Sequence, residues 1–229
     1  MNNLLIRASQ ASKLMTEPKL KSDKEAGNLS ETMKSYLSDL WLEYNYGYKD
    51  IVYTDPLLKG LLCEQDSMEL VQSVLGGQFR NKNTEHFKND FVMGTPDIVL
   101  KDCVEDIKTS YNIKTFFDAE LEKSYYWQGI CYMALTGIHN YRLIYCLVDT
   151  PDELITSEKT RMYYKFGCNE ENIDYQIASK QIEINNKYSH LPESDRIKIF
   201  EFQFNESDYE KLCNQIIKAR NYYNQITLK

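Results

Sequence analysis

The fold is decided by one stretch of sequence, Gly94-Thr95-Pro96-Asp97-Ile98-Val99-Leu100-Lys101-Asp102-Cys103-Val104-Glu105-Asp106-Ile107-Lys108-Thr109. Two runs rich in Ile and Val flank a polar pair at 101–102, which is typical of two short strands joined by a tight turn. A two-residue loop places Asp97 directly opposite Asp106. Lys108 then lies on the same face of the pleat. A four-residue loop would keep these three side chains on one face, whereas a three-residue loop would not.

The two acids of this stretch predict a metal site. Opposite each other on paired strands, Asp97 and Asp106 would have Cβ atoms roughly 5 Å apart and would repel each other. Both acids lie in apolar runs that indicate central strands, where an unpaired carboxylate is costly. A cation between the acids removes this cost. The alternative is a solvated hairpin that carries Asp and Lys on its surface.

The composition is that of a packed globular domain. Of 229 residues, 42% are hydrophobic and 13% aromatic, and a chain of this length can bury roughly 70% of its unfolded surface. The net charge of −7 argues against a broadly basic nucleic-acid coat but leaves room for local positive patches. No bilayer-spanning run and no signal peptide is recognisable, so we expect a cytoplasmic protein that does not bind a membrane. The six scattered cysteines form no CxxC pair, which predicts reduced, mostly buried thiols and no zinc or iron–sulfur site.

The N-terminal region predicts a helix followed by a loop. Residues 6–15 have the pattern of a short helix with Ser9 as a candidate N-cap. Residues 17–28 are polar and contain proline and glycine, so we expect an exposed loop. Its lysines serve solubility or, alternatively, attract phosphate.

Two longer helices are expected before the hairpin. Ser30 is placed to cap a helix that runs to about residue 45 and ends before Gly47. Its apolar stripe, which we assign to the core, consists of Met33, Tyr36, Leu37, Leu40, Trp41 and Tyr44. The second helix is expected over 56–75, with its buried positions at Leu61, Met68, Val71 and Leu75. Glu64 lies along this second stripe, so it faces a partner or a metal, or reaches solvent at the edge of the stripe.

The rest of the chain follows the same patterns. Strands are expected over 87–93, 140–148 and 197–204. Helices are expected over 115–121, 123–135, 151–164, 171–188 and 206–226. No repeat, low-complexity tract or linker divides the chain, so we expect one domain over residues 1–229. The fold class is α/β (α+β), with a central mixed β-sheet flanked by helices.

Four motifs stand in one order along the chain: Gly60-x3-Glu64, Gly94-x2-Asp97, Asp106-x-Lys108 and Gln128-x3-Tyr132. In this order and on these expected elements, the chain resembles the PD-(D/E)XK nucleases, and the Gln-x3-Tyr element is typical of their RecB-like branch. The chain also resembles phage and prophage exonucleases of the lambda-exonuclease/YqaJ type, in three further stretches: Arg7-Ala8-Ser9, Lys59-Gly60 and Tyr125-Tyr126-Trp127-Gln128. The resemblance covers roughly residues 4–150, so the motifs lie within 1–150 and residues 151–229 form an extension. It implies a restriction-endonuclease-like PD-(D/E)XK core.

The resemblance also implies a site. Its metal ligands would be Glu64, Asp97, Asp106 and the backbone carbonyl of Ile107, and Lys108 would orient or activate the attacking water. The acid of the Asp-x-Lys triplet is commonly Glu in these nucleases, and Glu105 stands beside it. We choose Asp106 because the alternation of a strand puts it, and not its neighbour, on the face of the lysine.

Four further residues receive a role from the resemblance. Gln128 and Tyr132 would brace the site or touch DNA, while helix packing explains their spacing equally well. Ser9 matches a position that contacts a DNA phosphate in lambda-type enzymes, and Arg7 belongs to the same short match.

The implied cofactor is Mg²⁺, with Mn²⁺ able to substitute, because carboxylate oxygens suit such hard cations. The implied substrate is the end of duplex DNA, hydrolysed in phage or prophage recombination or repair. A single-strand annealing protein and a homo-oligomer, such as a ring, are the implied partners. Few arginines are present, which favours backbone contacts over base reading. The alternatives are a sequence-nonspecific or restriction-type endonuclease of the same fold, and a catalytically silent DNA-binding relative.

Overall fold

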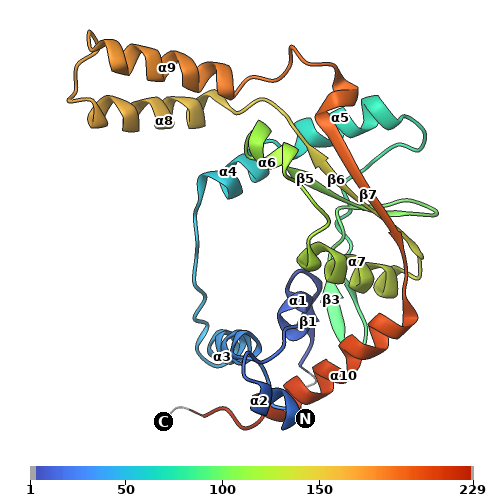
Figure 1. Cartoon of the computed structure of the whole chain (residues 1–229). Coiled ribbons are helices and arrows are strands. Elements are labelled where there is room, and N and C mark those ends of the chain that lie inside the picture. The colour runs from blue at the N-terminus through green and yellow to red at the C-terminus, as the bar shows by residue number, and fades with distance from the viewer. Residues whose placement is uncertain (1–3, 228–229) are drawn as a thin grey trace.

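Two mixed β-sheets form the centre of the protein in a computed structural model that describes residues 4–227 (Figure 1). The larger sheet has the order β4-β5-β6-β7, in which β5 and β6 are parallel and both outer pairs are antiparallel. Its strands are β4 (Ile98–Val99), β5 (Val104–Thr109), β6 (Asn140–Cys146) and β7 (Ile197–Gln203). The smaller sheet has the order β1-β3-β2. Its strands are β1 (Ile6–Arg7), β2 (Phe87–Lys88) and β3 (Val92–Gly94).

The predicted hairpin register is confirmed. The backbone N–H of Leu100 donates to the carbonyl of Cys103 at 2.9 Å, which closes a two-residue loop at 101–102. The β4–β5 ladder keeps this register. Continued by one residue, it puts Asp97 opposite Asp106.

The prediction of one continuous strand over 87–93 is wrong. The chain forms a separate hairpin there, in which β2 and β3 are antiparallel and belong to the smaller sheet. The stretch 94–100 is also interrupted, because Pro96 has no N–H to give to a ladder. Asn83 fixes this turn, since its side-chain amide donates to the Pro96 carbonyl at 3.0 Å and its backbone N–H to the Asp97 carbonyl at 2.7 Å.

The N-terminal expectations are partly wrong. Ser9 is not a helix N-cap: it is exposed inside the 3₁₀ turn η1 (Ala8–Gln10), because β1 pairs with β3 up to Arg7 and only then does the chain turn. The following helix α1 (Ala11–Leu14) starts two residues later than Ser9. The segment 17–28 is mostly exposed as expected but contains the short helix α2 (Lys21–Glu25).

The helix α3 (Glu31–Tyr46) begins and ends as predicted. The hydroxyl of Ser30 accepts the backbone N–H of Met33 at 3.1 Å, and Gly47 follows the helix with φ = 65°. Its stripe is buried from Met33 to Leu40, whereas Tyr44 is exposed. The core assignment is therefore wrong for Tyr44.

The single helix expected over 56–75 is two helices, α4 (Asp55–Leu62) and α5 (Glu64–Leu75). The break at Cys63 changes the helical phase. Leu61, expected in the core, is therefore 62% exposed, and Lys59 is fully buried instead.

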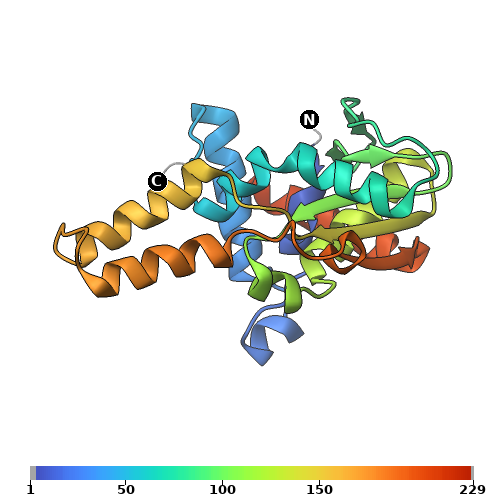
Figure 2. The ribbon, with the colours of Figure 1, turned by 90° about the horizontal axis from the view of Figure 1, so that it is seen from above.

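The later helices lie where the sequence predicts them, within a few residues. They are α6 (Ile113–Phe117), α7 (Lys123–Thr136), α8 (Asp152–Lys165), α9 (Ile173–Asn185) and α10 (Glu206–Tyr223). A short 3₁₀ turn, η2 (Glu193–Arg196), leads into β7. The helices α8 and α9 form a hairpin that projects from the body of the protein (Figures 1 and 2).

The larger sheet is covered on both faces. The helix α7 and the N-terminal helices share one apolar cluster with Val104, Leu143 and α10, whereas α5 shares a second cluster with Ile107 and Ile144 on the other face. Four of the six cysteines are buried and no disulfide is present among the described residues. Within residues 4–227, no helix is long and apolar enough to cross a membrane.

Two helical glycines provide a test of the α7 packing. A Cβ at Gly129 would lie 2.9 Å from the buried ring of Tyr141 and 2.6 Å from Phe202, whereas a Cβ at Gly60 would meet nothing within 4 Å. We expect Gly129→Ala to lower the free energy of unfolding by about 1–3 kcal/mol. Gly60→Ala should raise it by up to about 1 kcal/mol. Urea denaturation measures both values, and equal effects would contradict the tight packing at Gly129.

Candidate active site

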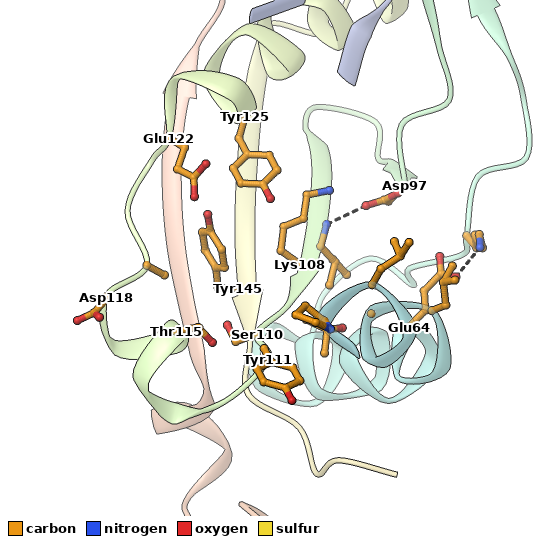
Figure 3. A pocket seen from close by; sticks show the side chains of 18 residues that line it. Glu64, Asp97, Lys108, Ser110, Tyr111, Thr115, Asp118, Glu122, Tyr125 and Tyr145 are labelled. Atoms are coloured by element: carbon orange, nitrogen blue, oxygen red, sulfur yellow. Dashed lines mark hydrogen bonds and ion pairs between the residues drawn. The ribbon is translucent and has the colours of Figure 1, made fainter. Parts of the chain in front are cut away.

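A cavity of about 900 Å³ opens at the carboxyl end of β5 (Figure 3). Its walls come from α4, the start of α5, the end of β5, and the segment from α6 to the first turn of α7. The polar side chains in these walls include Glu64, Lys82, Asp97, Lys108, Ser110, Tyr111, Thr115, Asp118, Glu122, Tyr125 and Tyr145. Three residues of the expected site, together with Ile107, therefore line one cavity.

Asp106 and Lys108 share a face of β5, as predicted. The Nζ atom of Lys108 lies 2.7 Å from Oδ2 of Asp106, so the two side chains form an ion pair. Asp106 is 1% exposed, and neither of its oxygens accepts a hydrogen bond from the described residues. A buried carboxylate without a donor is costly.

Asp97 lies beside this pair, across the strand. Its Oδ2 atom accepts the backbone N–H of Ile107 at 3.0 Å (Figure 3). Burial, and secondly the charge of Asp106, raise the pKa of Asp97 to about 8, against the opposing effect of Lys108. Burial alone would lower the pKa of Lys108, but the charges of the two carboxylates outweigh it and raise that pKa above its ordinary value.

Glu105 lies on the opposite face of the strand, where two arginines shield it from solvent. It is 0% exposed and accepts hydrogen bonds from Arg80 Nε at 2.7 Å, Arg80 Nη2 at 3.1 Å and Arg142 Nη1 at 2.8 Å. The side-chain alternation that favoured Asp106 over Glu105 is therefore present in the structure.

Glu64 is the first residue of α5 and lies in the cavity wall, but it faces a different partner. Its carboxylate is 2.6 Å from Lys82 Nζ and 37% exposed. The helix α5 packs on the face of the sheet opposite to Asp106, and Glu64 lines the same cavity as Asp97. Within residues 4–227, no three His, Cys, Asp or Glu side chains are grouped closely enough to hold a metal ion.

Gln128 and Tyr132 contact each other and the turn that carries Asp97. The Nε2 atom of Gln128 donates to the Tyr132 hydroxyl at 3.0 Å, and that hydroxyl donates to the Thr95 carbonyl at 3.2 Å. A Cβ at Gly94 would lie 2.8 Å from the Tyr132 ring, so only glycine allows this approach. Gln128 and Tyr132 therefore hold the turn before Asp97 against α7.

Arg7 and Ser9 are not part of the cavity wall. The Nη2 atom of Arg7 pairs with Glu43 at 2.6 Å, and Ser9 is exposed. The structure leaves a DNA contact at either residue as a prediction.

The sequence analysis assigns no role to two residues at or near the cavity, Tyr125 and Lys59. Tyr125, quoted only as part of a motif, places its ring 5.3 Å from Lys108 Nζ and contacts Tyr145 edge to face. Lys59 is 0% exposed behind the cavity, where it donates to the Tyr111 carbonyl at 2.9 Å and burial lowers its pKa to about 8. Only the tertiary packing of α4 and α7 reveals these contacts.

The fold is shared with solved exonucleases. A phage-related exonuclease from Haemophilus somnus 129PT superposes with a TM-score of 0.76 at 24% identity, over 97% of this chain and 94% of that one. The alkaline exonuclease LHK-Exo from Laribacter hongkongensis, also solved in complex with dAMP, superposes with a TM-score of 0.62 at 11% identity, over 96% and 88% of the chains. No protein-family model and no curated protein matches the sequence.

These two similarities establish the fold class. The chain has the restriction-endonuclease-like fold of phage-related and alkaline exonucleases, as the four motifs predict.

The raised pKa of Asp97 predicts how the metal-free protein responds to pH. The folded state keeps this proton up to about pH 8, whereas the unfolded state loses it near the ordinary value of 3.8. Folded protein thus binds more protons in this window, and stability must fall as the pH rises. In chelator, we expect the free energy of unfolding to drop by up to about 4 kcal/mol between pH 5 and pH 8.

Asp97→Asn should be more stable than the wild type at pH 8, and its free energy of unfolding should change little between pH 5 and pH 8. Asp118→Asn, at an exposed acid of the same cavity, should lose as much stability over this pH range as the wild type. Denaturant titrations at the two pH values measure the free energies of unfolding. A wild-type protein that is as stable at pH 8 as at pH 5 would contradict the buried carboxyl pair.

Proposed function

We propose that the protein is a Mg²⁺-dependent DNA exonuclease that hydrolyses phosphodiester bonds from duplex ends, in phage or prophage recombination or repair. One observation carries this proposal. Asp97 and Lys108 line a cavity, and Asp106 is paired with Lys108 beside it, in a chain with the fold of two exonucleases.

The donor set fits a hard divalent cation. Asp106 is buried with Lys108 as its ion-pair partner, and Asp97 has a second carboxylate oxygen that does not bind the backbone N–H of Ile107. Glu64, Asp97, Asp106 and the Ile107 carbonyl would hold the ion, with Mn²⁺ able to substitute. To bind the ion, Glu64 would have to break its ion pair with Lys82. When bound, the ion polarises the scissile phosphate and lowers the pKa of a coordinated water.

The other residues would orient the reactants. Lys108, fixed by Asp106 and stacked over Tyr125, would position the attacking water. Gln128 and Tyr132 would hold the turn of Asp97 at its working distance. Such prepositioning is a large part of catalysis, because the reacting groups then need little further ordering.

Several features favour DNA ends as the substrate. The net charge of −7 and the few arginines suit local backbone contacts, which position DNA without reading its sequence. The complex of the Laribacter enzyme with dAMP supports mononucleotides as the product. A homo-oligomer, an annealing protein as partner and the host cytoplasm as location rest on the resemblance of the sequence motifs.

Removal of either member of the Asp106–Lys108 pair should abolish catalysis. We expect Asp106→Ala and Lys108→Ala to lower the cleavage rate by at least about a hundredfold. Mg²⁺ should raise the melting temperature of the wild type, since a ligand of the folded state stabilises it, but raise that of Asp106→Ala much less. Lys114→Ala, at an exposed lysine of α6, serves as the control and should retain activity. Folded variants with nearly full activity would exclude the pair from the mechanism.

The exonuclease assignment is tested with linear duplex and covalently closed circular duplex of the same sequence, both with Mg²⁺. Linear DNA should be degraded progressively to mononucleotides or short products, and the circle should survive. Discrete fragments from the circle would refute the proposal in favour of a restriction-type endonuclease, and random nicking would indicate a nonspecific one. Binding without cleavage of either substrate, across Mg²⁺ and Mn²⁺, would identify a catalytically silent relative.

A further inference from the structure

A second cavity, of about 810 Å³, lies beside the catalytic one. Its walls come from α1 and the residues after it, the start of α3, and the first turns of α7, which packs against α1 (Figure 1). Glu122 lines both cavities. Of the next three residues, Lys123 and Ser124 line the second cavity and Tyr125 lines the catalytic one. The two cavities are therefore neighbours across the start of α7.

The second cavity has two lysines in its wall, one of which, Lys13, places its Nζ atom 5.1 Å from the centre of the Tyr36 ring. Lys13 and Lys123 line it, and neither forms an ion pair within residues 4–227. Of the two acids in its wall, Glu17 is paired with Lys24 at 2.7 Å. The other, Glu122, lies beside Tyr125 and Tyr145 at the catalytic cavity (Figure 3).

Hydroxyl groups and one aromatic ring complete the wall. Ser12 and Thr32 supply hydroxyls that can donate to phosphate oxygens, whereas the hydroxyl of Ser124 donates to Glu122 at 3.2 Å. Trp127 is half-buried, and the ring of Tyr126 fixes it edge to face at 5.4 Å between centroids. The indole lines the cavity, and the face of an aromatic ring is a platform on which any base can stack.

We propose that this α1–α7 cavity is a second nucleotide-binding subsite, which holds a nucleotide of a single DNA strand beside the catalytic cavity. Lys13 and Lys123 bind its phosphates, and Trp127 stacks on its base. The volume is within the range of roughly 300–1,000 Å³ that is usual for small-molecule sites. The choice of DNA as the ligand rests on the proposed function. A strand held here stays engaged while the neighbouring cavity releases product, so the subsite favours processive digestion.

Trp127 makes the subsite observable without catalysis. The chain has two tryptophans, so Trp41→Phe leaves Trp127 as the single indole reporter. A short single-stranded oligodeoxynucleotide is titrated into this variant in chelator, with fluorescence quenching as the signal. We expect saturable quenching that Lys13→Ala/Lys123→Ala weakens about tenfold or more. The double substitution should also reduce the slope of log K against log salt by about 1.4, or 0.7 for each lost phosphate contact.

Lys165→Ala/Lys180→Ala removes two exposed lysines of α8 and α9, outside the cavity wall, and serves as the matched control, with an affinity expected within about twofold of the parent. Absence of quenching, or equal losses in both double variants, overturns the subsite. If Trp41→Phe digests linear DNA but Trp127 is not quenched, the subsite fails and the nuclease function stands. Quenching that Lys13→Ala/Lys123→Ala abolishes, in a protein that cleaves no DNA, supports the subsite and refutes the nuclease.

Discussion

A buried and a partly buried carboxyl group that face each other across the β4–β5 pair are the constraint on which the rest of the structure depends. In the metal-free protein, burial and secondly the charge of Asp106 raise the pKa of Asp97. Lys108 compensates part of the charge from the same strand. The remaining cost has to be met by the stability of the surrounding fold.

The surroundings hold the two acids together from three sides. Asn83 and Tyr132 fix the turn that carries Asp97 through its neighbouring carbonyls. The opposite face of β5 is fixed by Glu105, whose carboxylate is bound by two guanidinium groups. A buried ion pair of this kind adds little net stability, but losing one partner is costly, so it opposes any shift of the strand. Rigid support of this sort lets a site keep an unfavourable arrangement of charges.

The sequence predicts what local periodicity controls. Strand alternation and a two-residue loop determine which side chains share a face, so the register of Asp97 and Asp106 and the rejection of Glu105 follow directly. The cap at Ser30 follows in the same way from local hydrogen bonding.

What the sequence does not predict depends on contacts distant along the chain. The break at Cys63 rotates α4 relative to α5, which exposes Leu61 and buries Lys59 against the carbonyl of Tyr111. Ser9 loses its expected role because β1 pairs with a strand more than eighty residues later. The pairing of Glu64 with Lys82 is likewise a tertiary contact that no local pattern contains.

The different surroundings of Glu105 and Asp106 have a consequence for how such chains are compared. Both residues are acids, and they are adjacent, so an alignment displaced by a single position would score almost as well as the correct one. It would nevertheless select a carboxylate enclosed by Arg80 and Arg142 on the opposite face of the sheet. For distant relatives of this chain, alternation along β5 therefore identifies the acid that faces Asp97 and Lys108 more reliably than the letters of the motif.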